Sequence, residues 1–281
     1  MILVTGATGT VGRELVAQLV GARQQVRALT RNPAKMRFAP EVEVVTGDLA
    51  EPTTLSRAVA EVDRIFSLSQ GPDVGHHETN LAHAARQAGV KHIVKLSVLG
   101  AGTAGGHGVV GWHERGEKAI QDSGASWTFV RPGMFMSNAL NWAPAIRSVG
   151  KVFLPYGDGK VVPIHPRDIA SVAAKALTEP GHESMAYSLT GAQALGAVEM
   201  MAILSEAVGK PIAYVSVSDE AASESMLKAG LPPVLVRELM KLAGGIRRGE
   251  AGTALPTIEQ VLGRKALTWR DWANENAAAF R

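Results

Sequence analysis

The feature that most constrains the fold is a glycine-spaced turn in the first twelve residues, which read MILVTGATGTVG. A short apolar strand leads into Gly6, Gly9 and Gly12, and an amphipathic helix follows at once. In such a turn the first glycine permits the tight bend, the second admits a pyrophosphate, and the third lets helix and strand pack closely. Free amides and the positive helix end then favour phosphates. An ordinary structural turn is the alternative, but the strand before and the helix after predict a dinucleotide site.

Strand-like and helix-like segments alternate over the first 190 residues. Apolar strands are expected at 2–4, 25–29, 42–45, 64–68, 92–96, 126–130 and 185–190. Amphipathic helices are expected at 11–20, 52–60, 74–88, 112–123 and 167–178. Such alternation predicts right-handed crossovers and a parallel sheet that is covered on both faces. We therefore expect an α/β protein with a Rossmann-type doubly wound parallel sheet.

After Gly191 the rhythm changes to helices at 197–208, 219–229, 232–242 and 268–279, with one strand at 212–217. We expect residues 1–150 to form the NAD(P)-binding Rossmann domain. Residues 151–281 form a mixed region that returns a helix and a strand, about 161–190, to the sheet. The rest makes a smaller, mostly helical C-terminal lobe on the substrate side, near the carboxyl edge where such sheets bind ligands.

Composition excludes several classes of function. The chain has no cysteine, which removes thiolate catalysis and fits a reducing cytoplasm. Its net charge of +3 is too small to indicate a nucleic-acid partner. A membrane span is not expected, because no run of about 18 apolar residues occurs, and a strand beginning at residue 2 leaves no room for a targeting segment. We expect no metal either: His76 and His77 are adjacent and face different ways on a helix, so with Glu78 they are expected to be solvated.

Residues 97–111 contain six glycines and are expected to form no stable element. Regular structure resumes directly afterwards, so this segment is typical of a mobile active-site loop rather than a linker.

The residues after the second strand indicate which dinucleotide is bound. NAD-preferring proteins place a carboxylate there, but positions 29–32 read LTRN. Arg31 and Lys35, one helical turn apart, are expected to clamp a 2′-phosphate, although a solvated basic surface is the alternative. The sequence thus favours NADP(H) over NAD(H). Asp48 is expected either to accept from the adenine amino group or to cap its own turn.

Several further landmarks keep a common order along the chain. They are TGATGTVG at 5–12, TRNPAK at 30–35, GDL at 47–49, Ser97, RPG at 131–133 and HPRDIA at 165–170. This set resembles the atypical short-chain dehydrogenases of the NmrA-like group. Within it, the chain is most similar to the NADPH-dependent quinone oxidoreductases of type 2 and the triphenylmethane reductases.

The resemblance implies a cofactor site. The pyrophosphate turn would be lined by Gly6, Thr8, Gly9, Thr10 and Val11. The 2′-phosphate would be bound by Arg31 and Lys35, and the adenine flanked by Asp48 and Leu49. The nicotinamide end would be bordered by Ser67 and Leu68 and shaped by Pro132 and Gly133.

The chain departs from ordinary short-chain dehydrogenases at their Tyr-x-x-x-Lys pair, in which the lysine lowers the tyrosine pKa. Val109 and His113 occupy these two positions. The resembled group carries His-x-x-x-Glu, which His113 and Glu117 match, and this spacing lets Glu117 orient the imidazole. His113 is expected to hydrogen-bond the nicotinamide ribose or a substrate oxygen, or else to form a surface salt pair. Ser97 keeps its usual place and completes the candidate catalytic set, with structural capping as its alternative.

Without the tyrosine, hydride transfer is expected to an acceptor that stabilises negative charge, such as a quinone, a cationic dye or a conjugated enone. The proton would come from water or from the His113 imidazolium. Residues 134–142 suit a flat aromatic substrate, although packing is the more common role of such residues. The alternative function is a non-catalytic NADP(H) sensor of the NmrA type, and a dedicated biosynthetic reductase is a third. The sequence predicts no oligomeric state.

Overall fold

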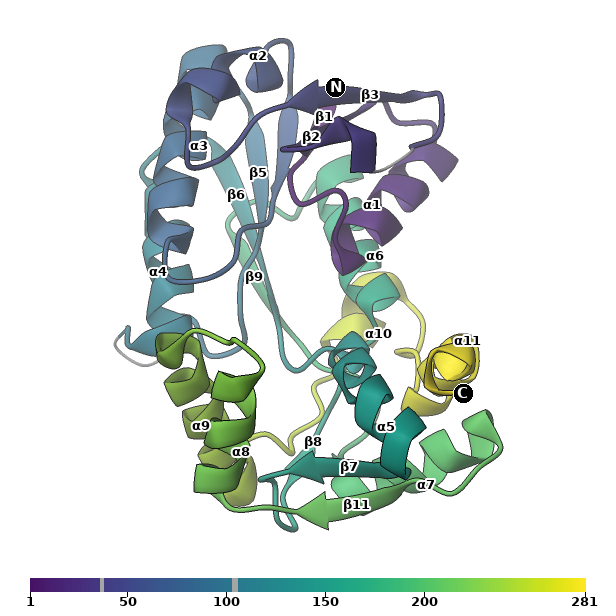
Figure 1. Cartoon of the computed structure of the whole chain (residues 1–281). Coiled ribbons are helices and arrows are strands. Elements are labelled where there is room, and N and C mark those ends of the chain that lie inside the picture. The colour runs from purple at the N-terminus through teal and green to yellow at the C-terminus, as the bar shows by residue number, and fades with distance from the viewer. Residues whose placement is uncertain (36–37, 103–105) are drawn as a thin grey trace. The chain divides into compact units, whose positions relative to one another are not determined.

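The computed structural model describes residues 1–35, 38–102 and 106–281. The chain divides into two compact units (Figure 1), the first formed by residues 1–132 and 166–189 and the second by residues 133–165 and 190–281. Position 150, the boundary expected from the sequence, lies within the second unit. None of the helices in these described ranges is long and apolar enough to cross a lipid bilayer.

The first unit contains a seven-stranded sheet in the order β3-β2-β1-β4-β5-β6-β9. Every neighbouring pair is parallel. The strands are β1 (Ile2–Val4), β2 (Val26–Thr30), β3 (Val42–Thr46), β4 (Arg64–Ser67), β5 (His92–Leu96), β6 (Ser126–Pro132) and β9 (Met185–Leu189). The expected Rossmann-type parallel sheet is therefore confirmed.

Helices cover both faces of this sheet. On one face α1 (Thr10–Gly21) packs against α6 (Pro166–Thr178), and on the other α3 (Val74–Ala88) packs against α4 (Gly108–Gln121), with the short α2 (Leu55–Val59) beside them (Figure 1). Short 3₁₀ helices follow β2 and β3, at Pro33–Lys35 and Pro52–Thr54. Strands covered on both faces are buried along their length, as every residue of β1 and β5 is.

Two expected boundaries are wrong. Helix α4 begins at Gly108, inside the glycine-rich segment that was expected to lack stable structure. Its glycines serve close packing, since a Cβ on Gly111 would lie 2.0 Å from the carbonyl oxygen of Gly106. Strand β6 continues through Pro132, because β9 pairs with it as far as Leu189. The expectation of a mobile loop falls partly on residues 103–105, outside the described residues.

The second unit is helical with two small sheets. Its helices are α5 (Ala143–Val149), α7 (Ala197–Val208), α8 (Asp219–Lys228), α9 (Pro233–Arg247), α10 (Thr257–Leu262) and α11 (Trp269–Asn276), with 3₁₀ helices at Met136–Trp142 and Ala277–Phe280. Strand β7 (Lys151–Leu154) pairs with β11 (Ala213–Ser216), and β8 (Lys160–Val161) pairs with β10 (Leu195–Gly196). The sequence predicted only the strand that became β11.

The aromatic residues of the C-terminal helix form the core of this unit. Trp269 stacks on Trp272 with ring centroids 5.0 Å apart, and Phe280 packs edge-on against Trp272. The indole Nε1–H of Trp269 donates to the carbonyl of Met200 at 3.0 Å, which satisfies its one polar group. Met136, one of the residues considered for an aromatic substrate, is buried in the same core.

Candidate functional site

The glycine turn has the close approaches that the motif requires. Gly6 adopts φ +60°, a conformation that favours glycine. A Cβ on Gly12 would lie 2.1 Å from the Gly6 carbonyl oxygen, so no other residue fits there without moving the backbone. The Gly9 amide donates to that same oxygen at 2.9 Å and closes the turn. The turn therefore requires glycine at its first and last positions.

This turn presents the start of α1 to solvent. Thr8, Gly9 and Thr10 are exposed, and within the described residues no side chain caps the helix and no acidic residue lies in its first turn. Its first amides are consequently available to an anion, in the field of the helix dipole. The side chain of Val11 is buried, so this residue can line the turn only with its backbone.

The end of β2 presents a basic side chain. Arg31 is exposed and has no acidic partner among the described residues. Asn32 accepts from the amide of Ala34 at 3.1 Å and starts the 3₁₀ helix of Pro33–Lys35. Arg31 precedes this helix, so it does not share a helical turn with Lys35 as expected. The side chain of Lys35 lies outside the described part of the structure.

The adenine candidates follow β3. Asp48 accepts from the amide of Ala50 at 3.0 Å, which is the turn-capping role that the sequence left open. Asn80 donates to the carbonyl of Leu49 at 2.8 Å and ties this turn to α3. Both turn residues are half-buried, so one side of each remains accessible.

The end of β4 is held by Thr5. Its buried hydroxyl accepts from the amide of Leu68 at 2.8 Å and donates to the carbonyl of the same residue at 3.2 Å. The Leu68 side chain lies against Gly6, where an added Cβ would be 3.0 Å from Leu68 Cδ2. The ends of β1 and β4, two expected cofactor-binding segments, are thus fixed to each other.

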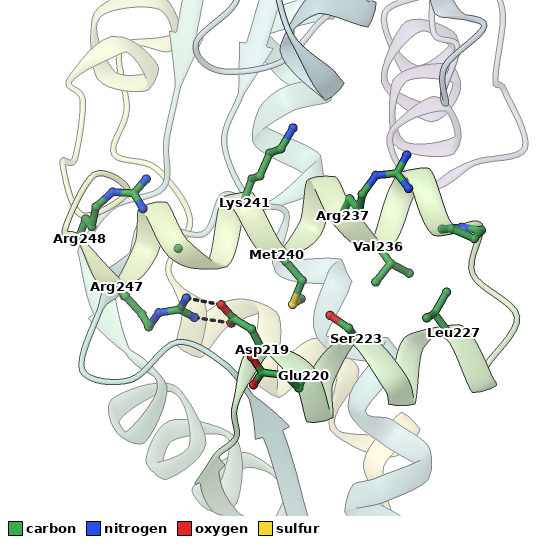
Figure 2. A pocket seen from close by; sticks show the side chains of 12 residues that line it. Asp219, Glu220, Ser223, Leu227, Val236, Arg237, Met240, Lys241, Arg247 and Arg248 are labelled. Carbon is green, nitrogen blue, oxygen red and sulfur yellow. Dashed lines mark hydrogen bonds and ion pairs between the residues drawn. The ribbon is translucent and has the colours of Figure 1, made fainter.

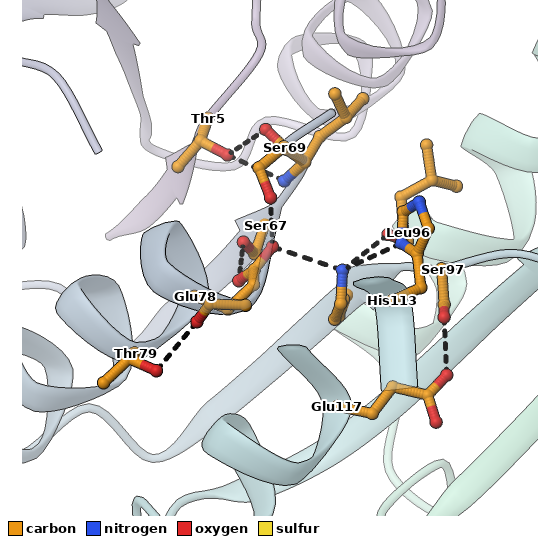
Figure 3. Close-up of polar contacts among 12 residues, drawn as sticks. Thr5, Ser67, Ser69, Glu78, Thr79, Leu96, Ser97, His113 and Glu117 are labelled. Carbon is orange, nitrogen blue, oxygen red and sulfur yellow. Dashed lines mark hydrogen bonds and ion pairs between the residues drawn. The ribbon is translucent and has the colours of Figure 1, made fainter. Parts of the chain in front are cut away.

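Beneath these strand ends lies a cluster that the sequence analysis missed, which we call the buried polar network: Ser67, Ser69, Glu78, Lys95 and His113 (Figure 3). The Glu78 carboxylate accepts from the Ser67 hydroxyl and from the Ser69 hydroxyl, the latter at 2.8 Å. Lys95 Nζ lies 3.2 Å from Glu78 Oε1, and both side chains have no exposed surface. Glu78 was expected to be solvated, and this expectation is wrong. A lysine within the apolar strand HIVKL was the available signal, because a buried lysine requires a partner.

The Lys95 ammonium also connects to His113. It donates to the carbonyl of Leu96 at 3.0 Å and lies 3.3 Å from His113 Nδ1. Burial, together with the positive charge of Lys95, lowers the pKa of His113 to about 3. His113 is therefore a neutral imidazole at physiological pH, which contradicts the expected imidazolium proton donor.

Glu117 does not orient the imidazole as the spacing suggested. Its carboxylate accepts from Arg131 Nε at 2.9 Å and from Arg131 Nη2 at 2.6 Å, a bidentate ion pair between α4 and β6. The Ser97 hydroxyl donates to the same carboxylate at 2.5 Å. The four-residue spacing placed Glu117 on the correct side of α4, but an arginine on β6 provides stronger, forked hydrogen bonds than an imidazole does.

The loop after β5 is fixed to the end of β6. The amide of Leu99 donates to the carbonyl of Pro132 at 2.9 Å, and the Ser97 amide donates to the carbonyl of Val130 at 2.7 Å. These bonds bring Ser97 and Pro132 together. Helix α4, whose sequence is GVVGWHERGEKAIQ, contains no tyrosine.

The second unit has a groove of about 850 Å³ between α8 and α9 (Figure 2). Its walls combine apolar and cationic side chains, among them Leu227, Val236, Arg237, Met240 and Lys241. Arg247 forms a forked ion pair with Asp219, at 2.8 and 2.7 Å, that joins the two helices. The charge of Arg247 is thus used to hold α8 against α9.

Residues 6–180 match a protein family described as NAD(P)H-binding. The chain is 42% identical over 283 residues to an NAD(P)H azoreductase of Xenophilus azovorans, covering 100% of this chain and 99% of that protein. It is 41% identical over 282 residues, with the same coverages, to a (4-alkanoyl-5-oxo-2,5-dihydrofuran-3-yl)methyl phosphate reductase of Streptomyces griseus. Among solved structures, the NADPH complex of the Escherichia coli quinone oxidoreductase QOR2 has a TM-score of 0.86 and 30% identity, covering 98% of this chain and 99% of that one. The expected resemblance to quinone oxidoreductases of type 2 and triphenylmethane reductases is confirmed, since structures of both are similar.

Proposed function

Because the chain belongs to the NAD(P)H-binding family and three relatives that are 42%, 41% and 31% identical to it are oxidoreductases, we propose that it is an NADPH-dependent reductase. Its acceptor is a quinone-like or other conjugated aromatic molecule. The observation that carries this acceptor class is the neutral His113 on a helix without tyrosine, because neither an imidazolium nor a tyrosine hydroxyl is then available to protonate a simple ketone.

The residues that would hold the dinucleotide fit its chemistry. The phosphates would lie against Thr8, Gly9 and Thr10, where the helix start is exposed and uncapped within the described residues. Arg31, with Lys35, would bind the 2′-phosphate, and Asp48 with Leu49 would flank the adenine. Preference for NADPH is supported by Arg31, which is exposed and without an acidic partner in the described chain, and by the NADPH complex of the similar quinone oxidoreductase.

A bound NADPH supplies the hydride. A quinone that receives it becomes an anion whose negative charge is spread over its ring, and water then protonates that anion. The imidazole of His113 donates a hydrogen bond to an oxygen of the acceptor or of the nicotinamide ribose, and does not give up its proton. The Ser97 hydroxyl donates its hydrogen bond to Glu117, so its oxygen can only accept a hydrogen bond from a ligand.

The names of the relatives support this range of acceptors. One relative is an azoreductase, one reduces a conjugated furanone that carries a methyl phosphate, and one is a quinone oxidoreductase. All three acceptors hold a conjugated system into which hydride can be delivered without an adjacent proton-donating side chain. We also propose a cytoplasmic location, because a chain without cysteine suits a reducing compartment.

The test is NADPH oxidation by the purified protein with a panel of acceptors: a benzoquinone, an azo dye, a conjugated furanone and a simple aliphatic ketone. We expect turnover with conjugated acceptors and none with the ketone, after subtraction of the reaction without protein. NADH is run in parallel to measure cofactor preference.

Binding of NADPH is measured separately by calorimetry. If NADPH binds and no acceptor supports turnover, the reductase proposal is wrong and the NADP(H)-sensing function is favoured. Turnover of one acceptor alone would instead indicate a dedicated biosynthetic reductase.

A further inference from the structure

We propose that the buried Lys95–Glu78 pair is a positioning device that fixes which nitrogen of His113 carries the proton. The pair holds Nδ1 as a hydrogen-bond acceptor, so that Nε2–H is the donor which the ring offers to a ligand. The consequence for catalysis rests on the proposed function, whereas the protonated position of the ring does not.

The geometry around Lys95 Nζ carries this inference. An ammonium has three N–H donors and cannot accept a hydrogen bond. Its three neighbours are Glu78 Oε1 at 3.2 Å, the Leu96 carbonyl oxygen at 3.0 Å and His113 Nδ1 at 3.3 Å. The three donors are matched by three acceptors. Nδ1 therefore accepts, and a neutral imidazole that accepts at Nδ1 carries its hydrogen on Nε2.

Glu78 stabilises the charged form of Lys95 in the interior. Lys95 has no exposed surface, and an unpaired buried ammonium would lose its proton. The Glu78 carboxylate balances the charge and is itself held by Ser67 and Ser69, which come from the end of β4. The contacts thus join two positions expected to touch the cofactor, Ser67 and His113.

The helix α4 packs closely against the pair at Gly116. A Cβ added to Gly116 would lie 2.8 Å from Glu78 Cγ and 2.9 Å from Lys95 Cε. Glycine at this position of α4 is what admits the two charged side chains between α3, β5 and α4. The space is therefore shaped for this pair.

A ring held in this way acts as an electrophile and not as an acid. Its Nε2–H stabilises negative charge on an acceptor oxygen, while the lowered pKa prevents a second proton from being held. Lys95 and Glu78 touch neither acceptor nor cofactor in this scheme, and they act through His113.

The first experiment reads the imidazole directly in the cofactor-free protein. Long-range proton–nitrogen NMR of ¹⁵N-histidine-labelled protein distinguishes the two neutral forms, and His113→Gln assigns the signal. We expect a single Nε2–H form from pH 5.5 to 8. In the Lys95→Met/Glu78→Gln variant, which removes both charges and leaves neither unpaired, we expect both forms to appear.

The matched control is Lys91→Met/Asp63→Asn, which removes a surface ion pair between the residues just before β5 and β4. The control should keep the wild-type spectrum. A wild-type ring protonated on Nδ1, or an unchanged single form in the Lys95→Met/Glu78→Gln variant, would overturn the proposal.

The second experiment measures turnover with a quinone. The Lys95→Met/Glu78→Gln variant should lose about tenfold or more in kcat, with the KM for NADPH changed less than about twofold. His113→Gln, whose amide nitrogen takes the place of Nε2, should retain more activity than His113→Asn, whose amide takes the place of Nδ1. Equal losses in these two variants would contradict the assigned donor. If the wild type turns over no acceptor, the proposed function fails while the spectra still decide the position of the proton.

Discussion

The glycine turn and the buried polar network, both in the first unit, treat polar groups in opposite ways, since the turn exposes them and the network buries them. The turn at residues 6–12 presents backbone amides to solvent and uses glycine to keep side chains away. The network buries a lysine and a glutamate completely and satisfies them with side chains from β4, the segment after it, and α4. One region leaves backbone donors exposed, and the other encloses a pair of charges beside an imidazole ring.

The difference shows where the stability of each region comes from. The turn depends on steric fit, so a single added carbon disturbs it. The network depends on the pairing of opposite charges. A single unpaired charge in the interior destabilises the fold by more than the intact pair stabilises it. Substitutions at the glycines of the turn and substitutions in the charged pair should therefore differ in their effects on unfolding free energy and on cofactor binding.

The largest effect is expected when one charge of the buried Lys95–Glu78 pair is removed. Lys95→Met leaves the Glu78 carboxylate buried without its cation and should lower the free energy of unfolding by about 3–5 kcal/mol. Urea unfolding at neutral pH measures this change. Lys91→Met, at an exposed lysine just before the same strand, is the control and should change it by less than about 1 kcal/mol. Equal losses in both variants would show that burial of the pair is energetically unimportant.

The next effect tests the fit of the turn. Gly12→Ala places a carbon 2.1 Å from the Gly6 carbonyl oxygen and should lower the free energy of unfolding by about 1–3 kcal/mol and weaken NADPH binding. Gly21→Ala in the same helix meets nothing within 4 Å and should be neutral or slightly stabilising. Thermal unfolding of the two variants, with calorimetric NADPH binding, separates them. Unchanged binding in Gly12→Ala would exclude the turn from the cofactor site.

A smaller effect is expected at the basic residues after β2. Arg31→Ala/Lys35→Ala should weaken NADPH by about 10- to 30-fold and NADH by less than about twofold, because only NADPH has the 2′-phosphate. Binding titrations with both cofactors at one fixed salt concentration measure the ratio. Arg23→Ala/Arg57→Ala, two other arginines of the first unit, controls for net charge. If both cofactors weaken equally, the preference for NADPH has another cause.

The smallest effect is a dependence on pH. The pKa of His113 falls from 6.5 to about 3 on folding, so the unfolded chain binds more protons between these values and stability falls as the pH is lowered. Between pH 7 and 5.5 this one group should cost about 1 kcal/mol. His113→Gln should show a shallower fall over the same interval, measured by urea unfolding at each pH. Parallel curves for wild type and variant would mean that His113 is not held neutral by the fold.

The same comparison explains what sequence alone could predict. The glycine turn, the parallel sheet and the helix α3 are encoded by residues close together in the chain, and their patterns were sufficient. The network was missed because Glu78, Lys95 and His113 come from separate elements and meet only after the sheet has formed. Glu117 was assigned to His113 because helical spacing was visible and Arg131, on another strand, was not. Short strands such as β8 and β10 have two residues each, too few to show a period.

One consequence of the two-unit division concerns synthesis of the chain on the ribosome. The first unit is complete only with α6 and β9, which follow residues 133–165 of the second unit along the chain. When the chain has emerged from the ribosome as far as residue 150, β6 is an open sheet edge and α1 lacks its packing partner α6. The sheet is completed late, so β6 stays an unpaired edge until β9 has emerged.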